Sequence, residues 1–451
     1  MIAKVSRNKG WVVVAAGLAI NLCLGVLYSW SVIAAYISAP KVDPVTGATS
    51  ATTWGLTAAQ ASLPYSVALG VFAVVMVFAG RAQDKFGPRI VATIGGALIG
   101  LGLIIASFTP KGTIAMMVVG FGVLGGTGIG LGYASATPAA VKWFNPTKKG
   151  IITGIVVAGF GLASVYISPL TTWLLGAKVD LKFTEIAGLG LGVNKTFLIL
   201  GILFLVITVL VAQFIKNPPK GYVVPEDTST KEKSSRAPVA GKREYDWHEM
   251  VKTWQFYALW IMYAFVSFAG LMIIGHMAKI AKAQLPAEQA ALGFLLVAIL
   301  AIGNASGRIV AGMVSDKIGR TMAMMLFFMS QALFMGVLWQ STSQLLLVIG
   351  AFGVGFNYGA NLTLFPATTG DYFGVKNMGV NYGLVFTAWG VGGVFGAQTA
   401  ASIVDATSSY AGAYALAAGL CVLAAAMTLM VRAPKVVDMT TLEEAELAPE
   451  G

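Results

Sequence analysis

Twelve long apolar segments constrain the fold of this chain more than any other feature of its sequence. A helix needs about 20 apolar residues to cross a lipid bilayer, and a spanning segment must satisfy its own backbone hydrogen bonds, which favours helices. The segments are residues 11–36, 57–80, 89–108, 113–139, 150–176, 194–215, 253–278, 290–314, 320–340, 344–370, 378–404 and 410–431. We therefore predict an all-α membrane protein with twelve transmembrane helices.

The composition agrees with a chain whose main solvent is lipid. Hydrophobic residues make up 57% of the sequence and charged residues 11%, whereas soluble proteins carry about 25% charge. The net charge of +11 does not indicate a nucleic-acid partner, because the basic residues form short clusters between apolar runs. Cys23 and Cys421 lie in separate apolar runs and indicate neither a disulfide framework nor a metal site. We expect no metal and no cofactor.

The longest hydrophilic stretch divides the chain into two sets of six segments. Residues 216–252 lack apolar periodicity, so we predict a mostly disordered cytoplasmic linker between bundles at 1–215 and 253–431, with a cytoplasmic tail at 432–451. With both termini inside, cytoplasmic segments carry 22 of the 30 Lys and Arg residues and outer loops carry 7. The positive-inside rule then predicts a multi-pass protein of the inner (plasma) membrane with cytoplasmic termini.

A charged loop occurs twice, once in each half. The sequence GRAQDKFGPR follows the second segment at residues 80–89, and GMVSDKIGR follows the eighth at residues 312–320. This spacing indicates a six-helix unit duplicated in parallel, and hence two pseudo-symmetric bundles. The loop's Asp and Arg suit an ion pair that holds the cytoplasmic side shut, or they only set topology. The candidate gating residues are Asp84, Lys85, Arg89, Asp316, Lys317 and Arg320.

Arg308 is an ionisable residue inside the eighth segment. Such residues are costly in a membrane and indicate a functional site. The predicted segment end places Arg308 four to six residues from the cytoplasmic surface, so snorkelling of its side chain is the alternative. Asn304 lies one turn earlier on the same face. No Asp or Glu falls in the core of a predicted helix, so a transported anion is the expected partner of Arg308, and its guanidinium suits a carboxylate.

Several aromatic and polar residues share the predicted helices with this arginine. Tyr28, Tyr133, Tyr358 and Trp389 are candidates to line a substrate cavity, with interfacial anchoring or helix packing as the alternatives. Asn361 adds hydrogen-bonding capacity. His276, near the outer end of the seventh segment, is either a proton carrier, since its pKa is near neutral, or an ordinary interfacial histidine.

These motifs together resemble the oxalate/formate antiporter family of the major facilitator superfamily, with the monocarboxylate porters as wider relatives. The likeness runs through both halves and excludes the linker, the tail and the first outer loop. The motifs that show the likeness are GVLYSW at 25–30, DKFGPR at 84–89, Tyr133 with Trp143-Phe144, Arg308 before SDKIGR at 315–320, LFP at 364–366 and NYG at 381–383. The resemblance implies the major facilitator fold and transport by alternating access.

At two positions this chain differs from the families that it resembles. The family's oxalate exchanger uses an arginine in span eight and a lysine in span eleven; Arg308 matches the arginine, whereas Trp389 stands at the lysine position. A single cation favours a monocarboxylate over oxalate. Animal monocarboxylate porters carry an Asp one turn before the arginine, where this chain has Asn304, so their proton route is not implied.

The sequence thus predicts a secondary active transporter, not an enzyme, for a small monocarboxylate such as lactate, pyruvate or formate. Proton symport and anion exchange both stay open, and we expect a functional monomer in the lipid bilayer. The alternatives are an oxalate/formate-type dicarboxylate exchanger and a receptor that binds an organic acid without moving it. The predicted substrate-binding residues are Arg308, Asn304, Tyr28, Tyr133, Tyr358, Trp389 and Asn361.

Overall fold

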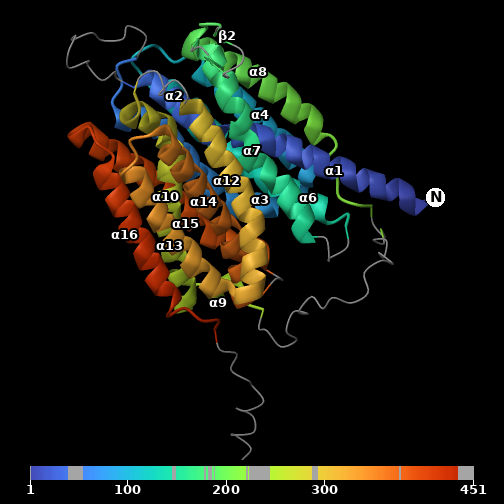
Figure 1. Ribbon diagram of the computed structural model, residues 1–451. Helices are drawn as coiled ribbons and strands as arrows, with labels where there is room; N and C mark the ends of the chain where they lie inside the picture. Colours follow the sequence, from blue (N-terminus) through green and yellow to red (C-terminus); the bar gives the residue numbers. More distant parts are fainter. Residues whose placement is uncertain are drawn as a thin grey trace, which may run out of the picture.

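Twelve helices in the described part of the chain are long and apolar enough to cross a membrane. The computed structural model describes residues 2–38, 54–144, 149–176, 179–180, 185–186, 188–219, 222, 244–286, 293–374 and 377–434. Each of the twelve helices coincides with one of the predicted segments, so the predicted all-α membrane fold is confirmed (Figure 1).

The first six spans occupy the blue to green part of Figure 1. Three pieces in line, α1 (Ile2–Leu24), the 3₁₀-helix η1 (Gly25–Ser29) and α2 (Trp30–Ile37), make the first span. The fourth span is likewise composed of α5 (Ala115–Met117), the π-helix η2 (Val118–Gly125) and α6 (Gly126–Val141). The others are α3 (Ala58–Phe86), α4 (Pro88–Ala106), α7 (Lys149–Leu175) and α8 (Gly192–Ala212).

The last six spans follow a short helix, α9 (Trp247–Met250). They are α10 (Trp254–Gln284), α12 (Gly293–Ile318), α13 (Arg320–Trp339), α14 (Gln344–Phe373), α15 (Met378–Thr407) and α16 (Ala411–Thr428). Between α7 and α8 the strands β1 (Val179–Asp180) and β2 (Glu185–Ile186) pair antiparallel, which is a small addition to an otherwise helical fold.

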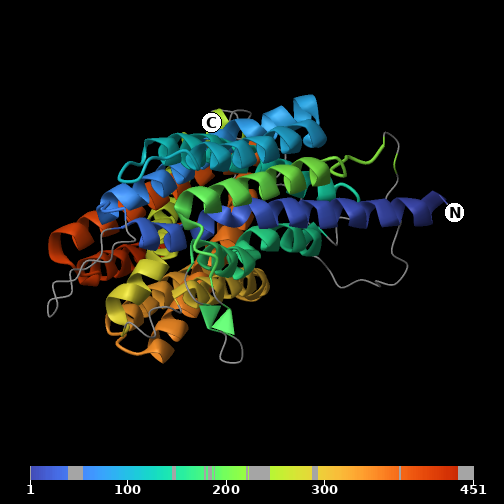
Figure 2. The ribbon, with the colours of Figure 1, turned by 90° about the horizontal axis from the view of Figure 1, so that it is seen from above.

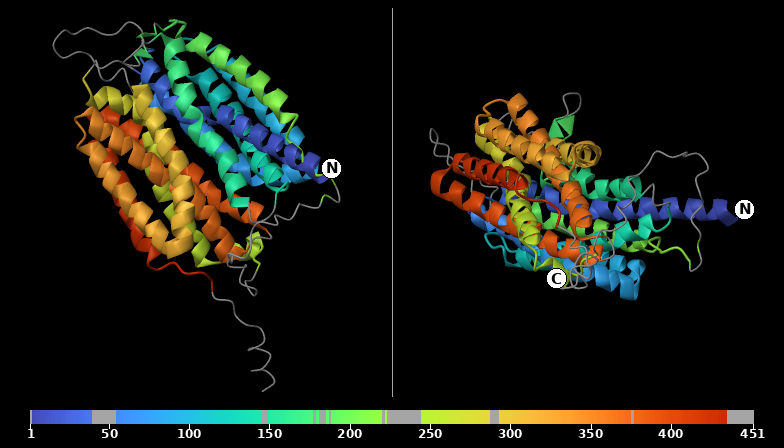
Figure 3. Two further views of the ribbon diagram at one scale, coloured as in Figure 1. Left: turned by 45° about the vertical axis from the view of Figure 1, so that its right-hand side comes forward. Right: turned by 90° about the horizontal axis from the view of Figure 1, so that it is seen from below.

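The helices gather into two groups, one blue to green and one yellow to red, which lie side by side in Figures 1 and 3. Seen from above in Figure 2, the N-terminal end of α1 reaches beyond the other helices. The two groups meet where α3 packs against α15 and where α7 packs against α12. The division into domains at residues 216–252 stays a prediction, because most of that stretch lies outside the described residues.

A glycine makes the same turn in both copies of the repeated loop. Gly87 has φ +84° and separates α3 from α4, while Gly319 has φ +89° and separates α12 from α13. Positive φ is readily adopted by glycine alone. The chain therefore reverses between neighbouring helices in the same way at both places, as a duplicated unit requires.

Two helices extend further than the apolar pattern predicts. The predicted seventh segment stops at residue 278, whereas α10 continues to Gln284 and includes Lys279 and Lys282. The predicted eighth segment stops at residue 314, whereas α12 continues to Ile318. Arg308 therefore lies ten residues from its helix end, not four to six. Charged residues lower the local hydropathy without breaking a helix, so apolar pattern alone ends such helices too early.

Part of the predicted disordered linker is helical. Asp246 accepts a hydrogen bond from the amide of Glu249, and the Glu249 side chain accepts one from the amide of Asp246. This capping box satisfies the free amides at the start of α9. The amide of Tyr245 donates to the carbonyl of Phe373, which ties this segment to the end of α14.

Candidate functional site

The arginine predicted from the sequence lies inside the protein. Arg308 on α12 is 7% exposed and Asn304, one turn earlier, is fully buried. The Nε of Arg308 donates to Oδ1 of Asn304 at 3.0 Å, and its Nη1 donates to the carbonyl of Val157 on α7 at 3.3 Å. These contacts hold the guanidinium in the interior, so the Arg308 side chain does not extend to the surface as the snorkelling alternative requires.

Two buried donors next to each other on α12 have no partner among the described residues: Nη2 of Arg308 and Nδ2 of Asn304. Nor does any described carboxylate pair with Arg308. Leaving a buried polar group unpaired costs about 1–3 kcal/mol, and more for a charged one. The arrangement therefore suits a ligand that brings negatively charged oxygen acceptors.

Close packing of α12 on α14 sets the position of these side chains. A Cβ atom on Gly307 would lie 1.9 Å from the carbonyl oxygen of Phe356, and one on Gly359 would lie 2.0 Å from the carbonyl oxygen of Asn304. Only glycine permits backbones to approach so closely, a common device in membrane helix packing. The two glycines flank Arg308 and Asn304 and fix them relative to α14.

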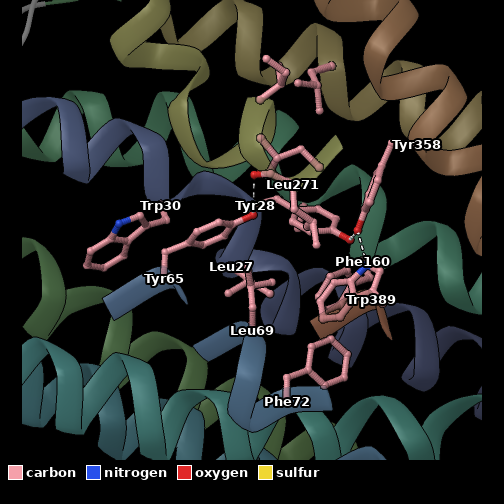
Figure 4. Close-up of a cluster of buried hydrophobic side chains, with 14 of the residues drawn as sticks. Leu27, Tyr28, Trp30, Tyr65, Leu69, Phe72, Phe160, Leu271, Tyr358 and Trp389 are labelled. Carbon is pink, nitrogen blue, oxygen red and sulfur yellow. Dashed lines mark hydrogen bonds between the residues drawn. The ribbon is translucent and has the colours of Figure 1, made fainter. Parts of the chain in front are cut away.

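Three of the predicted cavity residues form a hydrogen-bonded chain. Nε1 of Trp389 on α15 donates to the hydroxyl of Tyr358 on α14 at 2.7 Å, and that hydroxyl lies 2.8 Å from the hydroxyl of Tyr28 on η1. All three side chains are buried. Figure 4 shows the three side chains converging, with dashed lines at these contacts. The chain links the two halves, since Tyr28 belongs to the first half and its partners to the second.

Phenylalanines complete an aromatic cluster around these residues. The ring of Phe160 meets Tyr28 edge-on, with centroids 4.9 Å apart, and Trp389 stacks on Phe386 at 4.8 Å. Tyr133, which is half-buried, joins through edge contacts with Phe160 at 5.4 Å and Phe72 at 5.7 Å. These phenylalanines could not be predicted from the sequence, because Phe in an apolar helix looks the same whether it lines a site or faces lipid.

The aromatic cluster and the α12 pair form one region. The Arg308 guanidinium lies close enough to the Tyr28 hydroxyl to interact with it electrostatically, and the Asn304 side chain faces the same hydroxyl. Asn361, three residues after Tyr358 on α14, is buried, and neither its amide oxygen nor its nitrogen has a hydrogen-bond partner among the described residues. The structure thus brings together the predicted cation, its neighbouring amide and the three bonded aromatic residues, and Tyr133 lies at their edge.

The predicted gating arginines contact residues of their own halves. Nη1 of Arg320 lies 2.8 Å from Oδ1 of Asp316, and Nε lies 2.9 Å from Oδ2 of Asp371. Arg320 thereby ties the end of α12 to the end of α14. In the first half, Nε of Arg89 donates to Oε1 of Gln213 at 2.8 Å.

The other predicted gating residues are exposed or lie outside the described side chains. Lys85 is exposed, with its ammonium 5.4 Å from the ring centroid of Phe86, and Lys317 is also exposed. The side chain of Asp84 lies outside the described part of the structure. The gating role of the repeated loop stays a prediction.

His276 is fully buried and contacts residues near the predicted outer side. Its Nε2 lies 3.0 Å from the carbonyl of Ala397 and 3.3 Å from Oγ of Ser62, and its Nδ1 lies 3.0 Å from the hydroxyl of Tyr410. A neutral ring that donates from Nε2 and accepts at Nδ1 satisfies both nitrogens; this tautomer follows from the hydrogen-bond partners. The proton-carrier role stays a prediction.

Twelve spanning helices with polar groups buried between two halves define the class of a multi-pass membrane protein with a polar interior. Residues 11–397 and 277–449 match the model of the Major Facilitator Superfamily. The chain therefore belongs to this superfamily, as the repeated loops predict, and it is a transporter, not an enzyme.

Relatives with similar sequences cover most of the chain. An uncharacterized MFS-type transporter, YhjX of Escherichia coli K12, is 29% identical over 85% of this chain and 86% of its own. The oxalate:formate antiporter of Oxalobacter formigenes is 27% identical over 88% of this chain and 85% of its own. The apicoplast pyruvate carrier 1 of Toxoplasma gondii is 25% identical over 84% and 81%.

A solved structure has the same fold. The xylose transporter XylE from E. coli, in a partially occluded inward open conformation, superposes with a TM-score of 0.64. It covers 95% of this chain and all of its own, at 12% sequence identity. At that identity the likeness concerns the fold alone.

Proposed function

We propose that this protein carries a small monocarboxylate across the membrane by alternating access, and that Arg308 binds the carboxylate. The observation that carries the proposal is the pair of unpartnered donors on α12, Nη2 of Arg308 and Nδ2 of Asn304. A carboxylate supplies two acceptor oxygens and one negative charge, which would satisfy both donors and neutralise a buried cation.

The size and charge of the ligand follow from what surrounds this pair. Trp389 and Tyr358 are neutral, and Trp389 already donates its one N–H to Tyr358. Among the described residues, Arg308 is the cation that interacts electrostatically with the Tyr28 hydroxyl. One cation with aromatic walls favours a short acid with a single carboxylate and a small apolar part, such as lactate, pyruvate or formate.

The names of two relatives support an organic-acid substrate. One is an oxalate:formate antiporter and another a pyruvate carrier. Both substrates of the first and the substrate of the second are carboxylates, and formate and pyruvate carry one carboxylate each.

In the proposed cycle, the two halves rock about the bound acid. The hydroxyl contact between Tyr28 and Tyr358 joins the halves at the centre, so the aromatic cluster closes over the site when the halves meet. Asn304 orients Arg308, and Tyr133 and Asn361 complete the wall. The repeated loops around Asp84 and Asp316 stabilise a closed cytoplasmic side. We further propose cytoplasmic termini, a plasma-membrane location and a functional monomer.

The test of the anion site is uptake of labelled short acids into proteoliposomes, with and without a pH gradient. We expect Arg308→Gln to abolish uptake, and Arg308→Lys to restore only a small part, because lysine keeps the charge but lacks the planar fork. Arg432→Gln, which removes an exposed arginine after α16, serves as the control and should transport normally. Full uptake of every acid by Arg308→Gln would refute the assignment.

The same assay separates the second candidate, exchange of a dicarboxylate as in the oxalate:formate antiporter. Its supporting observation is the 27% identity with that protein. Uptake of oxalate that requires formate inside the vesicles, with no uptake of lactate or pyruvate, would favour it. A dependence of lactate uptake on the pH gradient would instead indicate proton symport.

A further inference from the structure

Two lysines lie in the last turns of α10, at the predicted outer side. Lys279 is 8% exposed, and its Nζ donates to the carbonyl of Ala58 at 3.4 Å and to Oγ of Ser62 at 3.3 Å. Lys282, one turn later, is exposed and donates to the carbonyl of Ala35 at 2.8 Å. These partners are neutral, and two of the three bonds are long.

The described hydrogen-bond partners of both lysines belong to the opposite half. The lysines are on α10, whereas Ala35 is on α2, and Ala58 and Ser62 are on α3. The two ammonium groups therefore depend for these bonds on contact between the halves.

Further hydrogen bonds between α15 and α3 join the two halves at the same end, the predicted outer side. The carboxylate of Asp405 on α15 accepts from the amides of Ala58 and Ala59, at 2.8 and 2.9 Å, at the N-terminus of α3. The side chain of Gln398 donates to Oγ of Ser66 at 3.0 Å, closer to the centre of the same helix pair. An anion at a helix N-terminus is stabilised by the free amides there, so Asp405 acts as a latch between the halves.

Opening of the outer side must break these bonds. Alternating access requires the halves to part there, and both lysines then lose the carbonyl and hydroxyl groups that solvate them. Asp405 lies within electrostatic range of Lys279, but one carboxylate cannot neutralise two ammonium groups. A net positive pair, three residues apart on one helix face, is thus uncovered at the mouth of the path.

We propose that Lys279 and Lys282 form an outer anion-binding site that exists only when the outer side is open, and that receives the carboxylate before it reaches Arg308. This inference rests on the proposed function. Lys279 is five residues from the end of α10, whereas Arg308 is fifteen residues from the start of α12. At about 1.5 Å per residue, the two sites are separated by about 15 Å of depth, so the acid would bind in two stages.

The experiment is protection from chemical labelling. A membrane-impermeant amine reagent is added to the outer side of right-side-out vesicles, in acetate, lactate or oxalate, or in chloride at equal ionic strength. Peptide mass spectrometry reads the labelling rates of Lys279, Lys282 and Lys111. Lys111, exposed between α4 and α5, is the internal control. The wild type is compared with Asp405→Asn, which weakens the latch.

We expect Lys279 to react slowly in the wild type and several-fold faster in Asp405→Asn. Carboxylates should slow the reaction of Lys279 and Lys282 several-fold relative to chloride, and leave Lys111 unchanged. An unreactive Lys279 in both proteins, or equal rates in carboxylate and chloride, would overturn the proposed site.

Transport kinetics separate this inference from the proposed function. We expect Lys279→Gln and Lys282→Gln to raise the external half-saturating concentration several-fold and to reduce its dependence on salt, since attraction of ions is screened within about 10 Å. Lys111→Gln should change neither. Unchanged kinetics in both lysine variants would overturn the outer site while acid transport stands. Protection from labelling in a protein that moves no acid would overturn the transport function while the outer site stands.

Discussion

At the scale of single residues, Tyr358 is the junction of the candidate site. Its hydroxyl meets Nε1 of Trp389 and the hydroxyl of Tyr28, and its ring packs on Gly270, where a Cβ atom would lie 2.4 Å from the ring. One hydroxyl therefore serves both partners in a region that excludes water.

Tyr358→Phe tests this junction. The change leaves the indole N–H of Trp389 buried without an acceptor, which costs about 1–3 kcal/mol. We expect a lower midpoint of thermal unfolding in detergent, together with slower uptake of the transported acid. Tyr257→Phe is the matched control, because Tyr257 on α10 is 55% exposed. Equal midpoints for the two variants would contradict the central role of the Tyr358 hydroxyl.

Residue chemistry made part of the site predictable. Arg308, Asn304, Tyr28, Tyr358 and Trp389 stand out because polar atoms are costly in an apolar helix. Which of them bond to each other depends on how helices from different halves meet, and local sequence does not contain that information. The apolar pattern ends the seventh segment at residue 278 and leaves Lys279 outside it, because charged residues lower the local hydropathy without breaking α10.

At the scale of helices, the pair α12 and α14 determines where the cation lies. Gly307 and Gly359 let the two backbones touch, and Thr363 on α14 donates its hydroxyl to the carbonyl of Arg308 at 3.1 Å. The apolar pattern predicted both helices, but it could not predict which faces meet. Glycines are frequent in these helices, and the sequence does not distinguish those that meet the facing backbone, such as Gly307 and Gly359, from those that do not, such as Gly312.

Gly307→Ala tests this packing. The new methyl group would lie 1.9 Å from a backbone oxygen, so the helices must move apart, and overpacking of this kind costs about 1–3 kcal/mol or more. We expect a lower unfolding midpoint and a higher half-saturating concentration of substrate, because Arg308 shifts with α12.

The control is Gly336→Ala on α13, where a Cβ atom would meet nothing within 4 Å. It should behave like the wild type or be slightly more stable, since alanine favours helices. If Gly307→Ala matched this control in stability and in uptake, the close contact would not be what positions Arg308.

At the scale of the whole molecule, the proposed orientation has a direct test. Single cysteines in place of Lys111 and of Arg432 occupy exposed positions at opposite ends of the helices. The native Cys23 and Cys421 are buried, so their background reaction is small. With an impermeant maleimide on intact cells, we expect only the cysteine at position 111 to react. Reaction at position 432 alone would reverse the topology.

The duplicated plan of the molecule was predictable because the loop motif repeats, and Gly87 and Gly319 make the same turn in both copies. The contacts between the halves were not predictable. Asp405, Gln398 and Tyr65 do not stand out in the sequence. Asp405 and Gln398 contact the opposite half because α3 lies along α15, and Tyr65 on α3 donates its hydroxyl to the carbonyl of Leu271 on α10.

The direct backbone contact of α12 and α14 at Gly307 and Gly359 has a consequence for how the protein moves. Because α12 and α14 meet through their backbones at these glycines, we expect Arg308 and Tyr358 to move together as one rigid unit of the second half. Tyr28, on η1, belongs to the first half. Rocking of the halves would then keep the cation beside the Tyr358 hydroxyl and pull both away from the first half, which breaks the contacts with Tyr28 and with the carbonyl of Val157. The acid would move with the second half. The hydrogen bond between Tyr28 and Tyr358 would form when the halves meet at the centre and break when they part, so its presence would indicate the conformation of the protein.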